Sequence, residues 1–241
     1  MCGIINPMGH LNVKNTMLRS FASLMFPHYC CSCGEIGDVL CANCKYDIIS
    51  EYTPKCLHCQ GPLASSDSSC GSCHLAFDNA WWVGHREGSL GTLVSVSKFE
   101  SQRRGCEVQA ELLHAVMPKL QGSIVVVPVP TIARHIRQRG YGHAEKIAKT
   151  LAHLRGYVYS PVVERQKQYV QHGSKRKDRE RQATESYAVA IKLPSDSTYL
   201  VVDDVYTTGF TSQYVAKALR DAGARRVYVA ITSRQPLDAQ R

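Results

Sequence analysis

The stretch Tyr199-Leu-Val-Val-Asp-Asp-Val-Tyr-Thr-Thr-Gly-Phe-Thr211 decides the fold that we predict for this chain. It opens with a continuous apolar run, which is typical of a parallel strand buried on both faces. Two adjacent carboxylates, Asp203 and Asp204, follow at the carboxyl end of the strand, where open α/β sheets bind their ligands. A loop of hydroxyls and glycine then enters a helix, and such a loop can surround a phosphate monoester with backbone N–H groups. The candidate phosphate-binding residues of the loop are Val205, Thr207, Thr208, Gly209 and Thr211.

Strands and helices alternate along the rest of the second part of the chain. The other expected strands are residues 80–85, 124–127 and 227–231. The expected helices are residues 90–99, 107–120 and 143–154, and one more that carries Val215, Ala218, Leu219 and Ala222 on one face and stops at Gly223. This alternation predicts an α/β fold around a parallel sheet.

Nine of the 11 cysteines lie between Cys30 and Cys73, and eight of these form four C-x-x-C pairs. A two-residue gap lets both thiolates of a tight turn point at one ion, and two such turns complete a tetrahedral Zn²⁺ site. The short loops between the pairs suit the two hairpins of a tandem zinc ribbon, and four thiolates at each ion make both sites structural. Cys30 and Cys31 are adjacent, and either can be the first ligand. The expected zinc ligands are Cys30, Cys33, Cys41, Cys44, Cys56, Cys59, Cys70 and Cys73.

A disulfide framework is the alternative interpretation of these cysteines, and it requires an oxidising compartment. Residues 1–20 contain no continuous apolar segment followed by a small-residue cleavage site, which argues against export. We therefore expect zinc-bound thiols in a cytoplasmic protein. No apolar run approaches the roughly 18 residues that span a bilayer, so we expect no membrane insertion.

Positive charge is concentrated in the second part of the chain. The formal net charge is +9, although residues 1–80 hold four basic and six acidic groups. Residues 131–155 contain six basic groups and one acidic group, and residues 165–181 contain seven basic and two acidic groups. Positive charge beside a predicted phosphate pocket favours a phosphorylated ligand first and nucleic acid second. For residues 165–181, a solvated charged hairpin or a nucleic-acid patch is the alternative.

Several of these motifs together resemble known families. The stretch 199–211 is similar to the phosphoribosyl pyrophosphate (PRPP) motif of type I phosphoribosyltransferases. Over residues 17–234 the chain resembles the ComF/GntX family. The matching segments are the double zinc ribbon, Lys98-Phe99, Val127-Pro-Val-Pro130, the Arg-Gly-aromatic segment at 139–141, a hairpin with Gln171, Arg179 and Tyr187, and the PRPP loop. Three places depart from the family pattern: Gly142-His143 replaces Asn-Gln, Gln182 replaces Asn, and Phe210 replaces a small residue.

The resemblance implies a type I phosphoribosyltransferase-like parallel sheet with a small N-terminal double zinc ribbon. The implied domains are a tail and short helix at 1–26, the double zinc ribbon at 27–76 and the phosphoribosyltransferase-like domain at 77–241. Asp203 and Asp204 would orient the ribose as the catalytic pair, and Thr207–Thr211 would hold its 5′-phosphate. The implied phosphate contacts outside this loop are Arg137, Arg139, Gly140 and Arg179.

Two hypotheses for the function follow. In the first, the chain is a phosphoribosyltransferase linked to natural competence and DNA uptake that binds Mg²⁺-PRPP or a related ribose phosphate, with Asp203 and Asp204 favouring this reading. In the second, the chain is a non-catalytic adaptor whose basic loops and zinc ribbon bind single-stranded DNA or a DNA-processing protein such as a helicase. The departures from the family pattern favour the second.

Overall fold

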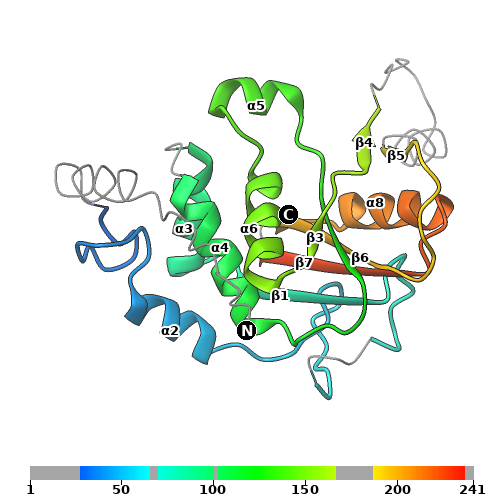
Figure 1. Cartoon of the computed structure of the whole chain (residues 1–241). Coiled ribbons are helices and arrows are strands. Elements are labelled where there is room, and N and C mark those ends of the chain that lie inside the picture. The colour runs from blue at the N-terminus through cyan, green and yellow to red at the C-terminus, as the bar shows by residue number, and fades with distance from the viewer. Residues whose placement is uncertain (1–27, 66–69, 100–102, 167–186, 237–241) are drawn as a thin grey trace, which may run out of the picture.

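The structure, a computed structural model, describes residues 28–65, 70–99, 103–166 and 187–236. Its centre is a five-stranded parallel sheet with the strand order β1-β7-β6-β2-β3 (Figure 1). The strands are β1 (Asn79–His85), β2 (Ile124–Pro128), β3 (Val158–Tyr159), β6 (Thr198–Tyr206) and β7 (Arg226–Arg234). The predicted α/β fold with a parallel sheet is therefore confirmed.

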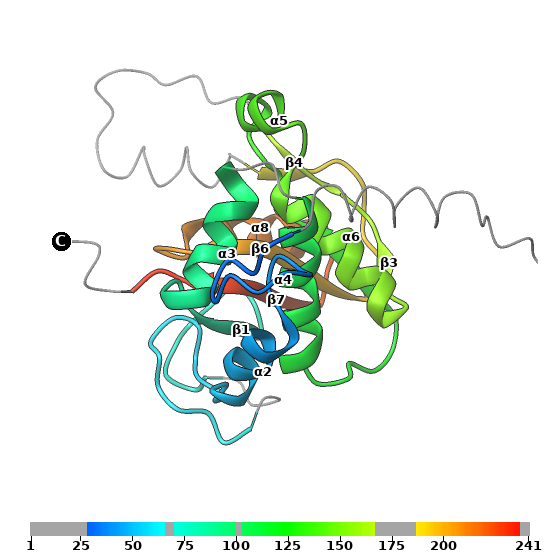
Figure 2. The same cartoon turned by 90° about the vertical axis from the view of Figure 1, so that its left-hand side faces the viewer.

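Helices cover both faces of this sheet (Figures 1 and 2). One face carries α3 (Gly88–Phe99), α4 (Arg103–Val116) and α6 (His143–Arg155), and the other carries α8 (Phe210–Asp221). The remaining elements are α2 (Ala42–Ser50), α5 (Ala133–Arg139) and an antiparallel hairpin of β4 (Val163–Arg165) and β5 (Tyr187–Val189), which packs beside α8.

Core side chains alternate along β6. Tyr199 and Val201 lie in the apolar cluster that includes α8, whereas Leu200 and Val202 lie in the cluster that includes α4 and α6. None of the four is more than 2% exposed. Each fully buried Val or Leu contributes about 1.5–3 kcal/mol through its removal from water. The continuous apolar run is thus explained by a strand with helices on both faces, which places Asp203 at the edge where the strand leaves the core.

Two segments on either side of β2 differ clearly from the expected structure. The helix expected at 107–120 begins and ends earlier, at Arg103 and Val116. Pro118 explains the earlier end, because the residue before a proline disfavours helical backbone. The basic segment after β2, which the second functional hypothesis treats as a loop, instead forms the short helix α5 (Ala133–Arg139), so that prediction was wrong. Its Ala, Arg and Gln residues favour helix, and Gly140 ends it in the left-handed conformation with φ 77°.

The cysteine-rich segment packs beside the edge strand β1 and contributes to both core clusters. Cys30 and Leu40 belong to the cluster on the α4 face together with Trp81. Leu57 belongs to the cluster on the α8 face together with Trp82. The two neighbouring tryptophans of β1 therefore point to opposite faces of the sheet, and each receives a different half of the cysteine-rich segment.

Two further sequence expectations concern the ends of the chain and membranes. The tail and short helix expected at residues 1–26 lie outside the described residues. Within the described ranges, no helix has both the length and the apolar character needed to cross a membrane.

Candidate functional site

A cavity of about 310 Å³ opens at the carboxyl ends of the central strands. Asp203 and Asp204 line it from the end of β6, as expected for the ligand-binding edge of an open α/β sheet. Thr211, in the first turn of α8, and Arg139, at the end of α5, line the same cavity. The structure thus brings together the predicted acidic pair, one predicted phosphate-loop residue and one predicted basic residue.

The two carboxyl groups of the acidic pair have different surroundings. Lys98 Nζ, from the end of α3, lies 2.8 Å from Asp204 Oδ2. The backbone N–H of Asp204 donates to Asp203 Oδ1 at 2.9 Å. Burial and the adjacent charge of Asp204 raise the pKa of Asp203 to about 8. In the absence of a ligand, Asp203 is therefore easier to protonate than an ordinary carboxyl group.

The loop after the acidic pair has the geometry that its sequence predicts. Gly209 precedes α8 in the left-handed conformation with φ 83°. A Cβ at this position would collide with the ring and hydroxyl of Tyr206, so the loop requires glycine here. Thr207 and Thr208 are exposed. The loop therefore presents hydroxyls next to the amino end of an α-helix, a combination that binds phosphate.

The predicted basic residues do not all reach the cavity. Arg139 is half-buried and lines it, whereas Arg137 is exposed on α5 and does not. Gly140 acts as the C-cap of α5 and gives the turn that places Arg139. Arg179 lies outside the described residues.

His143 holds Arg139 in place. Its Nε2 lies 2.8 Å from the backbone oxygen of Ser97, and its Nδ1 lies 3.3 Å from Arg139 Nη1. Burial lowers the pKa of His143, so the ring is neutral and one nitrogen donates while the other accepts. A neutral histidine thus offers one donor and one acceptor at the position where the family pattern has Gln: the donor anchors the ring to Ser97, and the acceptor faces the guanidinium of Arg139.

Several cavity residues lie outside the set of site residues predicted from the sequence, among them Lys98, Arg165 and Tyr187. Lys98 comes from α3, far from the acidic pair in sequence, and its only signal is the Lys98-Phe99 pair of the family pattern. Arg165 and Tyr187 are paired across the β4–β5 hairpin, with the guanidinium carbon 5.6 Å from the ring centre. Arg165 begins the basic run at 165–181, so the excess of positive charge in this run is the feature of the sequence that could have identified it.

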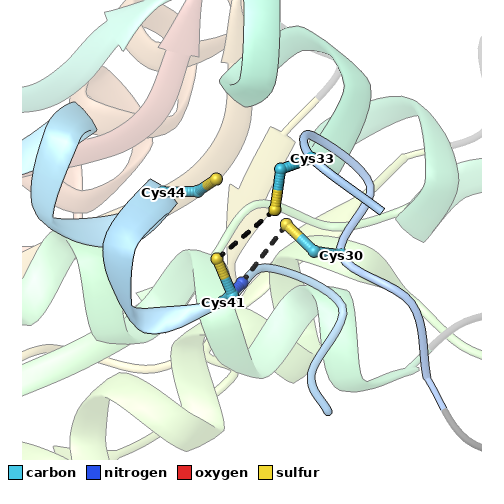
Figure 3. Close-up of side chains that lie close together, drawn as sticks. All are labelled: Cys30, Cys33, Cys41 and Cys44. Atoms are coloured by element: carbon cyan, nitrogen blue, oxygen red, sulfur yellow. Dashed lines mark hydrogen bonds between the residues drawn. The ribbon is translucent and has the colours of Figure 1, made fainter. Parts of the chain in front are cut away.

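The eight predicted zinc ligands form two groups, and within each group the four sulphur atoms lie within 4.8 Å of one another. The first cysteine group is Cys30, Cys33, Cys41 and Cys44 (Figure 3), and the second cysteine group is Cys56, Cys59, Cys70 and Cys73. Cys30, and not its neighbour Cys31, belongs to the first group. No disulfide joins two of the cysteines in the described ranges.

The second C-x-x-C pair of the first group starts a helix, although the sequence suggested a hairpin. Cys41 is the N-cap residue of α2, and Cys44 lies in the first turn of this helix. Cys33 Sγ lies 3.7 Å from Cys41 Sγ, and the Cys41 N–H donates to Cys30 Sγ at 3.4 Å (Figure 3). Although burial acts in the opposite direction, backbone N–H groups lower the pKa of Cys30 to about 6, which favours the thiolate that a metal requires.

Arg234 shows that a metal ion suits the second group. This side chain is 2% exposed, forms none of the ion pairs found among the described residues, and leaves its Nη1 without a hydrogen-bond partner there. Burial lowers the pKa of Arg234, whereas the thiols of Cys56 and Cys59 act in the opposite direction. Four thiolates around a divalent cation carry excess negative charge, which would balance the buried guanidinium. Both the donor set and the charge fit Zn²⁺.

The fold and the cavity define the class of the protein: it carries a phosphoribosyltransferase domain together with two four-cysteine groups. Residues 135–240 match the family described as "Phosphoribosyl transferase domain". Over 206 residues the chain is 30% identical to "Competence protein F" of Haemophilus influenzae, and this match covers 79% of the chain and 88% of that protein. The chain belongs to the ComF/GntX family, as the sequence resemblance implies.

Proposed function

We propose that this protein binds Mg²⁺-PRPP, or a related phosphorylated ribose, in the cavity at the end of β6 and transfers its phosphoribosyl group. The observation that supports this most strongly is the lining of one cavity by Asp203, Asp204, Thr211 and Arg139. Two carboxylates suit the vicinal hydroxyls of ribose. A threonine beside a helix amino end suits the 5′-phosphate, and a guanidinium suits pyrophosphate.

The proposed reaction is a displacement at C1 of the ribose. A bond from the acceptor nucleophile to C1 forms, the bond from C1 to the pyrophosphate oxygen breaks, and pyrophosphate leaves with the electron pair of that bond. Asp203 and Asp204 orient the ribose hydroxyls, while Arg139 neutralises charge on the departing pyrophosphate. Mg²⁺, when bound, supplies further charge neutralisation on the phosphate oxygens.

Calorimetry with Mg²⁺-PRPP tests the binding step. We expect a measurable heat with the wild-type protein. Replacing both carboxylates (Asp203→Asn with Asp204→Asn) should weaken binding about 100-fold or more, because two charge-assisted hydrogen-bond acceptors are lost. Asp221→Asn, on an exposed carboxylate at the end of α8, is the matched control and should leave the affinity unchanged. A wild-type protein that gives no heat at millimolar Mg²⁺-PRPP would contradict the proposal.

We also propose that each cysteine group holds one structural Zn²⁺. Metal analysis of the purified protein should find about two Zn²⁺ per chain. Zinc-bound thiols suit a reducing compartment, so we propose a cytoplasmic location. A zinc-free protein with disulfide-linked cysteines would overturn both points.

A pair of stacked aromatic rings, one of them exposed, supports a second candidate function, which is single-stranded DNA binding. Phe210, directly after Gly209, is 61% exposed and stacks on Tyr214 with ring centres 6.1 Å apart and planes at 12°. Bases of single-stranded nucleic acid stack on such rings, and α5 adds the exposed Arg134 and Arg137. The relative from Haemophilus influenzae is named for competence, which agrees with the link to DNA uptake that the family resemblance implies.

Gel retardation with a fluorescent single-stranded oligonucleotide tests this second function. Phe210→Ser should weaken retardation about fivefold or more if one base stacks there. Its binding of Mg²⁺-PRPP should change by less than about twofold, since the Phe210 side chain does not line the cavity. If Phe210→Ser retards the oligonucleotide as well as the wild type, the aromatic pair is not a stacking platform.

A further inference from the structure

A buried tyrosine lies between the Cys56–Cys59 turn of the second cysteine group and the loop proposed to hold the phosphate. His58 lies inside the Cys56–Cys59 turn, and its Nδ1 is 2.9 Å from the hydroxyl of Tyr206. Tyr206 is the last residue of β6, and its ring and hydroxyl lie directly beneath Gly209, where no Cβ would fit. One tyrosine side chain therefore touches the loop proposed to hold the 5′-phosphate and the turn that supplies two metal ligands.

Arg234 makes a second connection between the same two regions. Its Nε donates to the backbone oxygen of Leu57 at 2.7 Å, and its Nη2 donates to that of His58 at 2.8 Å. Its guanidinium also lies 5.7 Å from the ring centre of Tyr206. Both carbonyls belong to the Cys56–Cys59 turn, so the guanidinium fixes the backbone that aims the two thiols.

Tyr206 and Arg234 are also neighbours in the sheet. They are register partners in β6 and β7, and the N–H of Gln235 donates to the backbone oxygen of Tyr206 at 2.8 Å. Both residues are at most 2% exposed. Two adjacent, buried strand ends therefore join the Cys56–Cys59 turn of the second cysteine group to the loop.

The first cysteine group lacks such a connection among the described residues. Its anchoring side chains, Asp38 and Lys45, contact Arg104 and Glu111 of α4. These contacts lie on the opposite core cluster from α8. The first group thus serves as the internal reference for any effect that the second group shows.

We propose that Tyr206, His58 and Arg234 are positioning residues that couple the second cysteine group to the phosphate loop, so that metal in the group and an anion in the loop stabilise each other. This inference rests on the proposed function, since Mg²⁺-PRPP is the anion that the loop would bind. Coupling of this kind is reciprocal: if the metal-bound turn favours the loop conformation that binds the ligand, the ligand must hold the metal site closed to the same extent.

Site-resolved alkylation of the cysteines tests the coupling in the full-length, zinc-loaded protein. The protein is treated with N-ethylmaleimide, and the modification rate of each cysteine peptide is followed by mass spectrometry. We expect saturating Mg²⁺-PRPP to slow alkylation of the second group at least about fivefold, and to change that of the first group by less than about twofold. Equal protection of both groups, or of neither, while calorimetry shows binding, would overturn the coupling.

The Tyr206→Phe variant separates this coupling from the proposed function. Without ligand, loss of the hydroxyl should speed alkylation of Cys56 and Cys59 about fivefold, the equivalent of one hydrogen bond, and leave Cys33 and Cys41 unchanged. Tyr46→Phe, on an exposed tyrosine of α2, is the control. This comparison needs no PRPP. If Mg²⁺-PRPP does not bind, the proposed function fails. Faster alkylation of the second group in Tyr206→Phe would still support the coupling, and an unchanged alkylation rate would overturn it.

Discussion

The two cysteine groups share one ligand pattern but are fastened to the molecule in different ways. The first is held by ion pairs: Arg104 and Lys45 both contact Asp38, at 2.7 and 3.0 Å, and both also contact Glu111. The second is held by the buried guanidinium of Arg234, which caps two carbonyls of a metal-ligand turn. The side chains of the ion pairs are 20–33% exposed, whereas Arg234 is 2% exposed.

This difference in burial indicates that the first cysteine group is a scaffold, whereas the second is coupled to the ligand loop. Partly exposed ion pairs contribute about 1 kcal/mol or less each and weaken in salt. A buried cation that satisfies two carbonyls cannot be removed without leaving polar groups unpaired, and its loss costs several times more. We infer that the first group ties a helix to the outside of α4, while the second is part of the structure that shapes the ligand loop.

The largest expected effect on the free energy of unfolding comes from removing the hydrogen bonds that Arg234 makes to the second cysteine group. Arg234→Met keeps the length of the side chain but removes the guanidinium, and leaves the carbonyls of Leu57 and His58 without donors. The free energy of unfolding of the zinc-loaded protein should fall by about 3 kcal/mol or more. Urea denaturation measures this loss. Arg225→Met, on an exposed arginine in the turn before β7, is the control and should stay within about 0.5 kcal/mol of wild type.

Asp203→Asn should have a smaller effect of opposite sign. The pKa of Asp203 is raised to about 8 in the folded protein, above its ordinary value, so its stabilising contribution is complete below about pH 4. This contribution is lost as the pH rises through 8, because the folded state must then bear a half-buried carboxylate beside the charge of Asp204. In the absence of ligand, Asp203→Asn should therefore raise the free energy of unfolding at pH 8 by about 1 kcal/mol or more.

The pH dependence provides the check on this prediction. Thermal melts from pH 4 to pH 9 should show that the wild-type protein loses stability relative to Asp203→Asn as the pH rises. Parallel curves for the two proteins would mean that Asp203 ionises at its ordinary pKa. The same variant should lose affinity for Mg²⁺-PRPP, so stability and ligand binding would change in opposite directions at the end of β6.

The sequence alone predicts those features of the sheet and of the two cysteine groups that depend on residues close together in the chain. The apolar run at 199–202 and the spacing of the C-x-x-C pairs identify the sheet and both groups, because strand burial and tetrahedral ligation leave a pattern in neighbouring residues. Lys98 and Arg234 leave no such pattern. Arg234 follows an apolar run as an ordinary polar strand end would, and only the packing of the Cys56–Cys59 turn against β7 buries it.

The smallest expected effect comes from loosening the first group, and it tests whether this group is only a scaffold. Although burial acts in the opposite direction, hydrogen bonds from Arg104 and Lys45 hold the pKa of Asp38 at about 2. This stabilising contribution is present above about pH 4 and is lost as the pH falls through 2. Arg104→Met should lower the free energy of unfolding at pH 7 by about 1 kcal/mol, and by less in 0.5 M NaCl because salt screens ion pairs.

The affinity of Arg104→Met for Mg²⁺-PRPP tests whether the first cysteine group influences the phosphate loop. The affinity of Arg104→Met for Mg²⁺-PRPP should stay within about twofold of wild type, because no described contact leads from Asp38 to the phosphate loop. Tyr206→Phe, measured in the same titrations, should bind about fivefold more weakly through the loss of one hydrogen bond. If both variants weaken binding equally, the two cysteine groups do not differ in function. The ion pairs on α4 would then couple the first group to the ligand site as strongly as Tyr206 and Arg234 couple the second.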